Sequence, residues 1–126
     1  MRLGLFICAI LYLSVSCKKA VVEEVCTQPT VVSYKNDIQP IFNTNCATSG
    51  CHAGKKPAGS LNLEASVSFE NISDSKSGYI DTVNPTASLL YTSMTSVTNP
   101  MPPNGKLSKC TTDLILKWIE QKAKNN

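Results

Sequence analysis

The sequence predicts a small all-α domain. Three segments of the 126-residue chain carry apolar residues at helical spacing, over residues 36–46, 84–94 and 108–123. Gly and Pro interrupt the chain between them, in 53–59 and 99–105, and make these connections loops. The chain is long enough for one small domain and no more.

The first element is an export signal over residues 1–16. Arg2 precedes an apolar run, Leu3 to Val15, which is too short to span a bilayer as a mature helix. Cys17 follows the small Ser16 and precedes two lysines, a pattern that resembles the lipidation site of a bacterial lipoprotein. Ordinary signal cleavage, which would release a soluble periplasmic protein, is the alternative.

Lipidation of Cys17 predicts the domain organisation and the location. We expect residues 17–32 to be a lipid-anchored tether and residues 33–126 to be the folded domain. The protein would be exported and held on a membrane by its lipid, facing the periplasm or the cell surface of a Gram-negative bacterium.

The next element is a helix over residues 36–46. Asn36 is the expected N-cap, Asp37 supplies an acid to the first turn, and Ile38, Ile41 and Phe42 share one face. This helix would place Cys46 at its C-terminal end. Residues 61–72 alternate only weakly and predict either a short helix or an irregular wall of a pocket.

Two further helices follow. Asn84 and Pro85 are typical of a helix start, and Met94 lies on the apolar face of that segment, so we expect it in the core. Ser108 is the expected N-cap of the last helix, in which Trp118 belongs to the buried face.

The chemistry of the chain centres on Cys46 and on Cys51-His52, which contains the single histidine. A Cys-x-x-Cys-His run is typical of covalent c-type haem attachment, with two thioethers to the porphyrin and His bound to iron. Here four residues separate the cysteines instead of two. A Cys46–Cys51 disulfide with His52 on the surface is the competing interpretation, and zinc is disfavoured because adjacent Cys and His are poorly spaced around a tetrahedral ion.

Met101 lies among three prolines in Asn99-Pro100-Met101-Pro102-Pro103. Such a segment is stiff and extended, and a thioether is a soft ligand suited to iron on the face opposite a histidine. We therefore expect His52 and Met101 to be the iron ligands of one haem c. After His52, a backbone carbonyl near Pro57 is the expected acceptor for the second ring nitrogen.

The remaining cysteines follow from these assignments. If Cys17 carries lipid and Cys46 and Cys51 carry haem, Cys26 and Cys110 are left over. In an oxidising compartment they most simply form a disulfide.

The order of these motifs, over about residues 33–124, resembles the small monohaem c-type cytochromes. More narrowly, it resembles the cytochrome c-like lipoproteins of Bacteroidetes and Planctomycetes. The resemblance implies a cytochrome c fold with the first and last helices packed across each other. It also implies Cys46 and Cys51 as thioether attachments, His52 as proximal ligand and Met101 as distal ligand. The wider cysteine spacing leaves open whether one or both sulfurs are attached.

The sequence thus predicts an electron carrier and not an enzyme, because His/Met ligation fills both axial positions of the iron. Its partners would be redox proteins and the membrane, with the protein a monomer or a subunit of a larger redox complex. Scattered lysines and a net charge of +3 argue against nucleic acid. Two alternatives remain, namely a five-coordinate haem enzyme or sensor, and a non-haem, disulfide-stapled surface lipoprotein.

Overall fold

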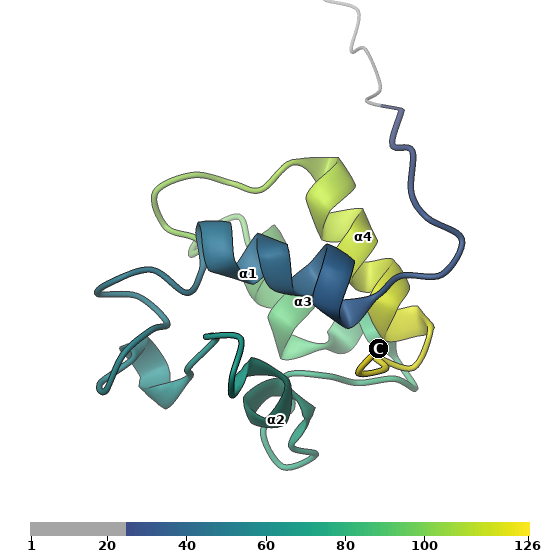
Figure 1. Ribbon diagram of the computed structural model, residues 1–126. Helices are drawn as coiled ribbons and strands as arrows, with labels where there is room; N and C mark the ends of the chain where they lie inside the picture. The colour runs from purple at the N-terminus through teal and green to yellow at the C-terminus, as the bar shows by residue number, and fades with distance from the viewer. Residues whose placement is uncertain (1–24) are drawn as a thin grey trace, which may run out of the picture.

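The computed structural model describes residues 25–126, which form helices and loops and contain no strand. The predicted signal sequence and the lipidation site Cys17 lie outside these residues. Figure 1 shows α1 crossing in front of α3 and α4, with α2 set apart below them. The elements in chain order are η1 (Tyr34–Ile38), α1 (Gln39–Asn45), η2 (Ala58–Ser60), α2 (Ser68–Ser73), η3 (Pro85–Ala87), α3 (Leu89–Thr95) and α4 (Lys109–Glu120).

The first helix begins earlier than predicted. Ser33, not Asn36, is the N-cap, because its hydroxyl accepts from the Asn36 N–H at 3.2 Å while its own N–H donates to Asp37 at 2.7 Å. The opening turn, η1, is π-helical, and Pro40 then falls in the first turn of α1, where its missing N–H costs little. As predicted, the helix ends at Cys46, whose N–H donates to the Phe42 carbonyl.

The segment predicted as one helix over 84–94 is two pieces. Pro85–Ala87 forms a single 3₁₀ turn, and Ser88 is extended before α3 begins. The buried Ser88 hydroxyl accepts from the Asp81 N–H at 2.9 Å, and the Leu89 N–H donates to the Gly78 carbonyl at 3.1 Å. These contacts with the preceding loop hold Ser88 in a non-helical conformation. The hydrogen bonds to the loop therefore interrupt the helix that the local sequence favours.

The last helix matches its predicted start. The Ser108 hydroxyl accepts from the Thr111 N–H at 3.1 Å, which caps α4. The helix ends at Glu120, three residues before the predicted end, because Lys122 and Ala123 adopt positive φ. The Ala123 N–H then donates back to the Trp118 carbonyl at 3.0 Å, which terminates the helix in the manner of a Schellman turn.

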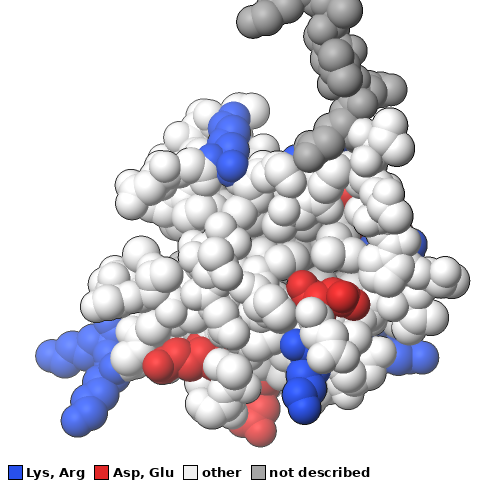
Figure 2. All heavy atoms as spheres, turned by 45° about the horizontal axis from the view of Figure 1, so that its top comes forward, with Lys and Arg blue, Asp and Glu red and all other residues white. Residues whose placement is uncertain are grey.

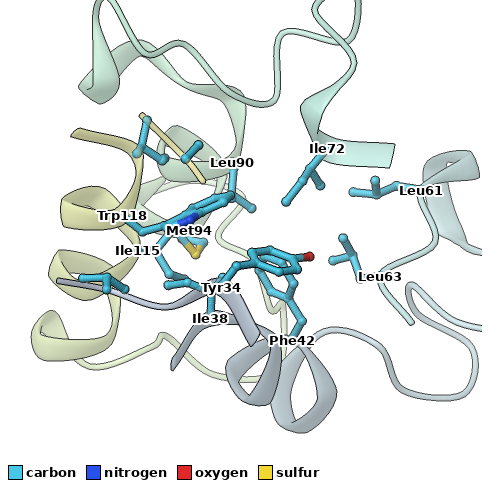
Figure 3. Close-up of a cluster of buried hydrophobic side chains, with 13 residues drawn as sticks. Tyr34, Ile38, Phe42, Leu61, Leu63, Ile72, Leu90, Met94, Ile115 and Trp118 are labelled. Carbon is cyan, nitrogen blue, oxygen red and sulfur yellow. The ribbon is translucent and has the colours of Figure 1, made fainter. Parts of the chain in front are cut away.

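The core joins the first and last helices (Figure 3). Trp118 and Met94 are 1 % and 4 % exposed, so both are core residues as expected. The Tyr34 ring lies 5.2 Å from the Trp118 ring and contacts Phe42 and Phe69 edge-on. This aromatic cluster fixes η1 and α1 against α4.

The end of the predicted tether belongs to the folded domain. Cys26 and Cys110 are disulfide-bonded, with Cα atoms 5.2 Å apart, as the sequence predicts. Gln121 accepts from the Val32 N–H at 2.9 Å and donates to the Thr30 carbonyl at 2.8 Å. Val32 is 2 % exposed. These contacts tie both ends of the segment from Cys26 to Val32, which the sequence assigns to the tether, to Cys110 in α4 and to Gln121 just after α4.

No helix within residues 25–126 is both long and apolar enough to cross a membrane. On the face drawn in Figure 2, basic and acidic side chains are interspersed among many uncharged ones.

Candidate functional site

Backbone hydrogen bonds close the loop between Cys46 and His52. The His52 N–H donates to the Cys46 carbonyl at 3.0 Å, and the Cys51 N–H donates to the Thr48 carbonyl at 2.9 Å. Gly50 takes φ of +80°, a conformation that favours glycine. The extra residues of the wide cysteine spacing thus form a closed turn, and both cysteines remain beside His52.

His52 has one ring nitrogen already engaged. Its Nδ1 lies 3.2 Å from the Leu61 carbonyl oxygen. Because a carbonyl oxygen can only accept, Nδ1 carries the proton in the neutral ring and Nε2 keeps its lone pair. The expected kind of partner is present, but it is Leu61 and not a residue near Pro57. The tautomer is the one that binds a metal through Nε2.

Met101 approaches from the other side of the chain. Its N–H donates to the Ser93 carbonyl at 2.9 Å, which ties the proline-rich loop to the last turn of α3. The side chain is 42 % exposed. The peptide bond between Met101 and Pro102 is cis.

Two cavities meet at Cys46, His52 and Met101. One, of about 160 Å³, also has Cys51 and the Pro102-Pro103 pair in its wall. The other, of about 210 Å³, continues towards the core and is lined by those three shared residues together with Leu61, Leu63, Tyr79, Leu89, Leu90, Ser93 and Met94. All four residues predicted to hold haem line the first of these cavities, whose wall is mostly apolar.

The two cysteines that line this space are free thiols in the structure. Burial and, secondarily, the neighbouring Cys51 raise the pKa of Cys46 to about 11. Cys46 is consequently a protonated thiol at neutral pH and a poor nucleophile unless it is activated.

The chemistry of these residues is suited to haem, for which they would offer one nitrogen and one sulfur ligand to the iron. A flat apolar macrocycle requires an apolar cavity, which the leucines and prolines of the walls provide. Its iron requires an available nitrogen lone pair, which the hydrogen bond to Leu61 leaves on His52. Within residues 25–126, no group of three or more His, Cys, Asp or Glu side chains is placed to hold a metal ion.

Several wall residues are missed by the sequence. Tyr79 lies in a loop without periodicity, so nothing in the local pattern marks it as part of the cavity. Met94, the rival of Met101 as an iron ligand in the sequence, is expected in the core on the ground of helical periodicity, and it also lines the same cavity as Met101. The segment 61–72, predicted as either a short helix or an irregular wall of a pocket, contains both. Residues 61–67 are irregular, and Ser68–Ser73 forms α2.

Comparison with known proteins identifies no relative. No family model matches the chain, and no curated protein or solved structure matches it.

Proposed function

We propose that this protein is a c-type cytochrome that carries electrons through one covalently attached haem. The observation that carries the proposal is the convergence of Cys46, Cys51, His52 and Met101 on one apolar space. The composition of this set is specific, since two thiols, one imidazole with a free lone pair and one thioether are what haem c requires.

Each residue has a distinct role in the proposal. Cys46 and Cys51 would hold the haem covalently, each through a thioether. His52 binds through Nε2, while its Nδ1–H stays on the Leu61 carbonyl. Met101 would hold the iron through its soft thioether sulfur, and the bound haem would supply one-electron redox chemistry.

The surrounding chain contributes rigidity and a low dielectric. Hydrogen bonds fix Cys46, His52 and Met101 by their backbones. Leu61 and Leu63 are 8 % and 2 % exposed and keep water from the histidine side of the cavity. A rigid and dry site favours electron transfer, because little of the protein must rearrange when the charge on the iron changes.

Membrane attachment is part of the same proposal. Lipid on Cys17 would hold the domain at a membrane surface. The chain between Cys17 and the disulfide at Cys26 would set its reach. Redox partners would then be met in the space next to that membrane.

The five-coordinate alternative is favoured by one observation. Met101 is 42 % exposed, whereas Met94, the other methionine at the cavity, is 4 % exposed. A haem without Met101 as ligand would leave iron open to peroxide or a small gas.

One comparison of variants tests the ligand assignment. The protein is expressed with the cytochrome c maturation machinery as wild type, Met101→Ala and Met94→Leu. Met101→Ala is expected to lose the absorption band of Met bound to ferric iron and to have a lower midpoint potential with haem retained. Met94→Leu removes the other thioether at the cavity while conserving the apolar volume of this buried side chain, so this control should keep the absorption band. A Met101→Ala protein with an unchanged spectrum and potential contradicts distal ligation by Met101.

A further inference from the structure

The orientation of His52 depends on a loop that has little regular structure. The loop leaves His52 and returns at Leu63, whose N–H donates to the His52 carbonyl at 2.8 Å. Within the loop, Gly54 and Gly59 adopt positive φ, and the only helical piece is the single turn η2. The carbonyl that holds the histidine ring, that of Leu61, belongs to this same loop. Because helical hydrogen bonds do not fix this carbonyl, other hydrogen bonds must keep it in place.

Two side chains on the outer side of the loop hold it at Gly54. The Asn62 side-chain amide donates to the Gly54 carbonyl at 3.3 Å, and one carboxylate oxygen of Glu64 accepts from the Gly54 N–H at 3.1 Å. The same carboxylate oxygen accepts from the Asn62 amide at 2.8 Å. Both polar groups of the Gly54 backbone are thus bound by the Asn62–Glu64 pair, which we call the Gly54 clamp.

The clamp is itself anchored to the fold. The Glu64 N–H donates to the Asn62 side-chain oxygen at 2.8 Å, and the Asn71 side chain of α2 donates to the Asn62 carbonyl at 2.7 Å. Leu61 and Leu63, on either side of Asn62, are buried in the core. Gly54 follows His52 by two positions. The clamp therefore connects the start of the loop, next to the histidine, to the segment that provides the carbonyl.

From this geometry we propose that Asn62 and Glu64 are positioning residues for His52, acting through Gly54 and the Leu61 carbonyl. Neither side chain lines the cavities, so neither is a ligand. Their effect is to keep the Leu61 carbonyl oxygen within hydrogen-bonding reach of the Nδ1–H, which it meets at 3.2 Å, and aimed at it. A strong acceptor on Nδ1–H makes the imidazole a better electron donor to a metal, so the clamp would lower the reduction potential of the iron. This consequence for the potential rests on the proposed function, whereas the effect on the histidine ring does not.

The test variants are chosen around the Glu64 carboxylate oxygen that accepts from both Gly54 and Asn62. Glu64→Gln keeps one side-chain oxygen that can accept from both Asn62 and Gly54, so it should preserve the clamp. Glu64→Ala removes both bonds. Glu70→Ala is the matched control, because it removes an exposed carboxylate on α2 that lies outside the clamp. Asn62→Ala is a second disrupting variant that leaves the charge unchanged.

The protein as isolated from a host with cytochrome c maturation is used for three measurements. These are the covalent haem content, the midpoint potential, and the solvent exchange rate of the His52 Nδ1–H by NMR, which is unambiguous because the chain has one histidine. We expect Glu64→Ala and Asn62→Ala to exchange up to about tenfold faster, the change typical of losing one side-chain hydrogen bond, and to have a higher potential. Glu64→Gln and Glu70→Ala should match the wild type.

The proposal is overturned if Glu64→Ala and Asn62→Ala exchange at the rate of Glu70→Ala. It is also overturned if they exchange faster but a haem-containing protein keeps the wild-type potential. A wild-type protein without covalent haem would contradict the proposed function, and the exchange rates would still decide whether the clamp positions His52.

Discussion

Removing the Cys26–Cys110 disulfide should lower the free energy of unfolding without changing the native fold. The bond joins cysteines 84 residues apart in sequence. In the chain-entropy model, a loop of this length stabilises the folded state by about 4.5 kcal/mol, because the disulfide restricts the unfolded chain. The double variant Cys26→Ser/Cys110→Ser should lose about this much stability.

The structure indicates why the native state should tolerate the change. Gln121 binds Thr30 and Val32 independently of the disulfide, and Val32 stays in the core. Only the few residues around Cys26 can detach from α4. The helical circular dichroism of the variant should therefore equal that of the wild type.

Urea denaturation provides the assay, with the wild type in a thiol reductant as the matched control. The variant and the reduced wild type should unfold at the same, lower midpoint. Both should have a steeper dependence on urea, because their unfolded chains expose more surface. A loss below about 1 kcal/mol with an unchanged slope would refute the reasoning, since it would mean that the bond does not restrict the unfolded chain.

Three other predictions concern single groups. Ser108→Ala should cost about 1 kcal/mol of unfolding free energy in urea, because α4 loses its N-cap, and an unchanged midpoint would argue against the cap. Hydrogen bonds from Asn62 and from the Gly54 N–H hold the pKa of Glu64 below its usual 4.5. The stability that this carboxylate contributes is thus present above pH 4.5 and lost as the pH falls further, so acid unfolding should be shallower in Glu64→Gln; equal curves would contradict this. In haem-free protein, iodoacetamide should alkylate Cys46 slowly at neutral pH, with a rate that rises until the pH passes its pKa of about 11; fast neutral labelling by peptide mass would contradict burial of the thiol.

The parts of the fold that follow local rules could be predicted from the sequence. Ser108 caps α4 as expected, because a hydroxyl before an amphipathic helix is a local signal. The burial of Met94 and Trp118 follows from helical periodicity. These features depend on residues a few positions apart, which a single sequence displays directly.

The parts that the sequence did not predict depend on contacts made outside the element concerned. Ser88 breaks a predicted helix because its hydroxyl bonds to the backbone of Asp81. Cys26 to Val32 was assigned to the tether, but its partners on α4 are about ninety residues away in sequence. The Cys26–Cys110 pairing follows from the count of cysteines, but no sequence pattern marks the contacts of Gln121 with Thr30 and Val32.

The candidate site shows the same division. Its reactive residues, Cys46, Cys51, His52 and Met101, stand out by chemical type. The acceptor for His52 is a backbone carbonyl, which every residue carries, so the sequence gives only its approximate place, and Pro57 was the wrong choice over Leu61. Tyr79 was missed because loop residues carry no periodic signal.

The most direct test of the proposed function is a pyridine haemochrome spectrum of denatured, purified protein, combined with its intact mass. The protein is produced with cytochrome c maturation genes, and a Cys46→Ala/Cys51→Ala variant is the control. We predict a haem that remains attached after denaturation, with a mass increase of one haem that the variant lacks. The band position distinguishes attachment at one sulfur from attachment at both. A colourless protein whose mass corresponds to cysteines paired only with each other would contradict the cytochrome proposal and favour a disulfide-stapled surface lipoprotein.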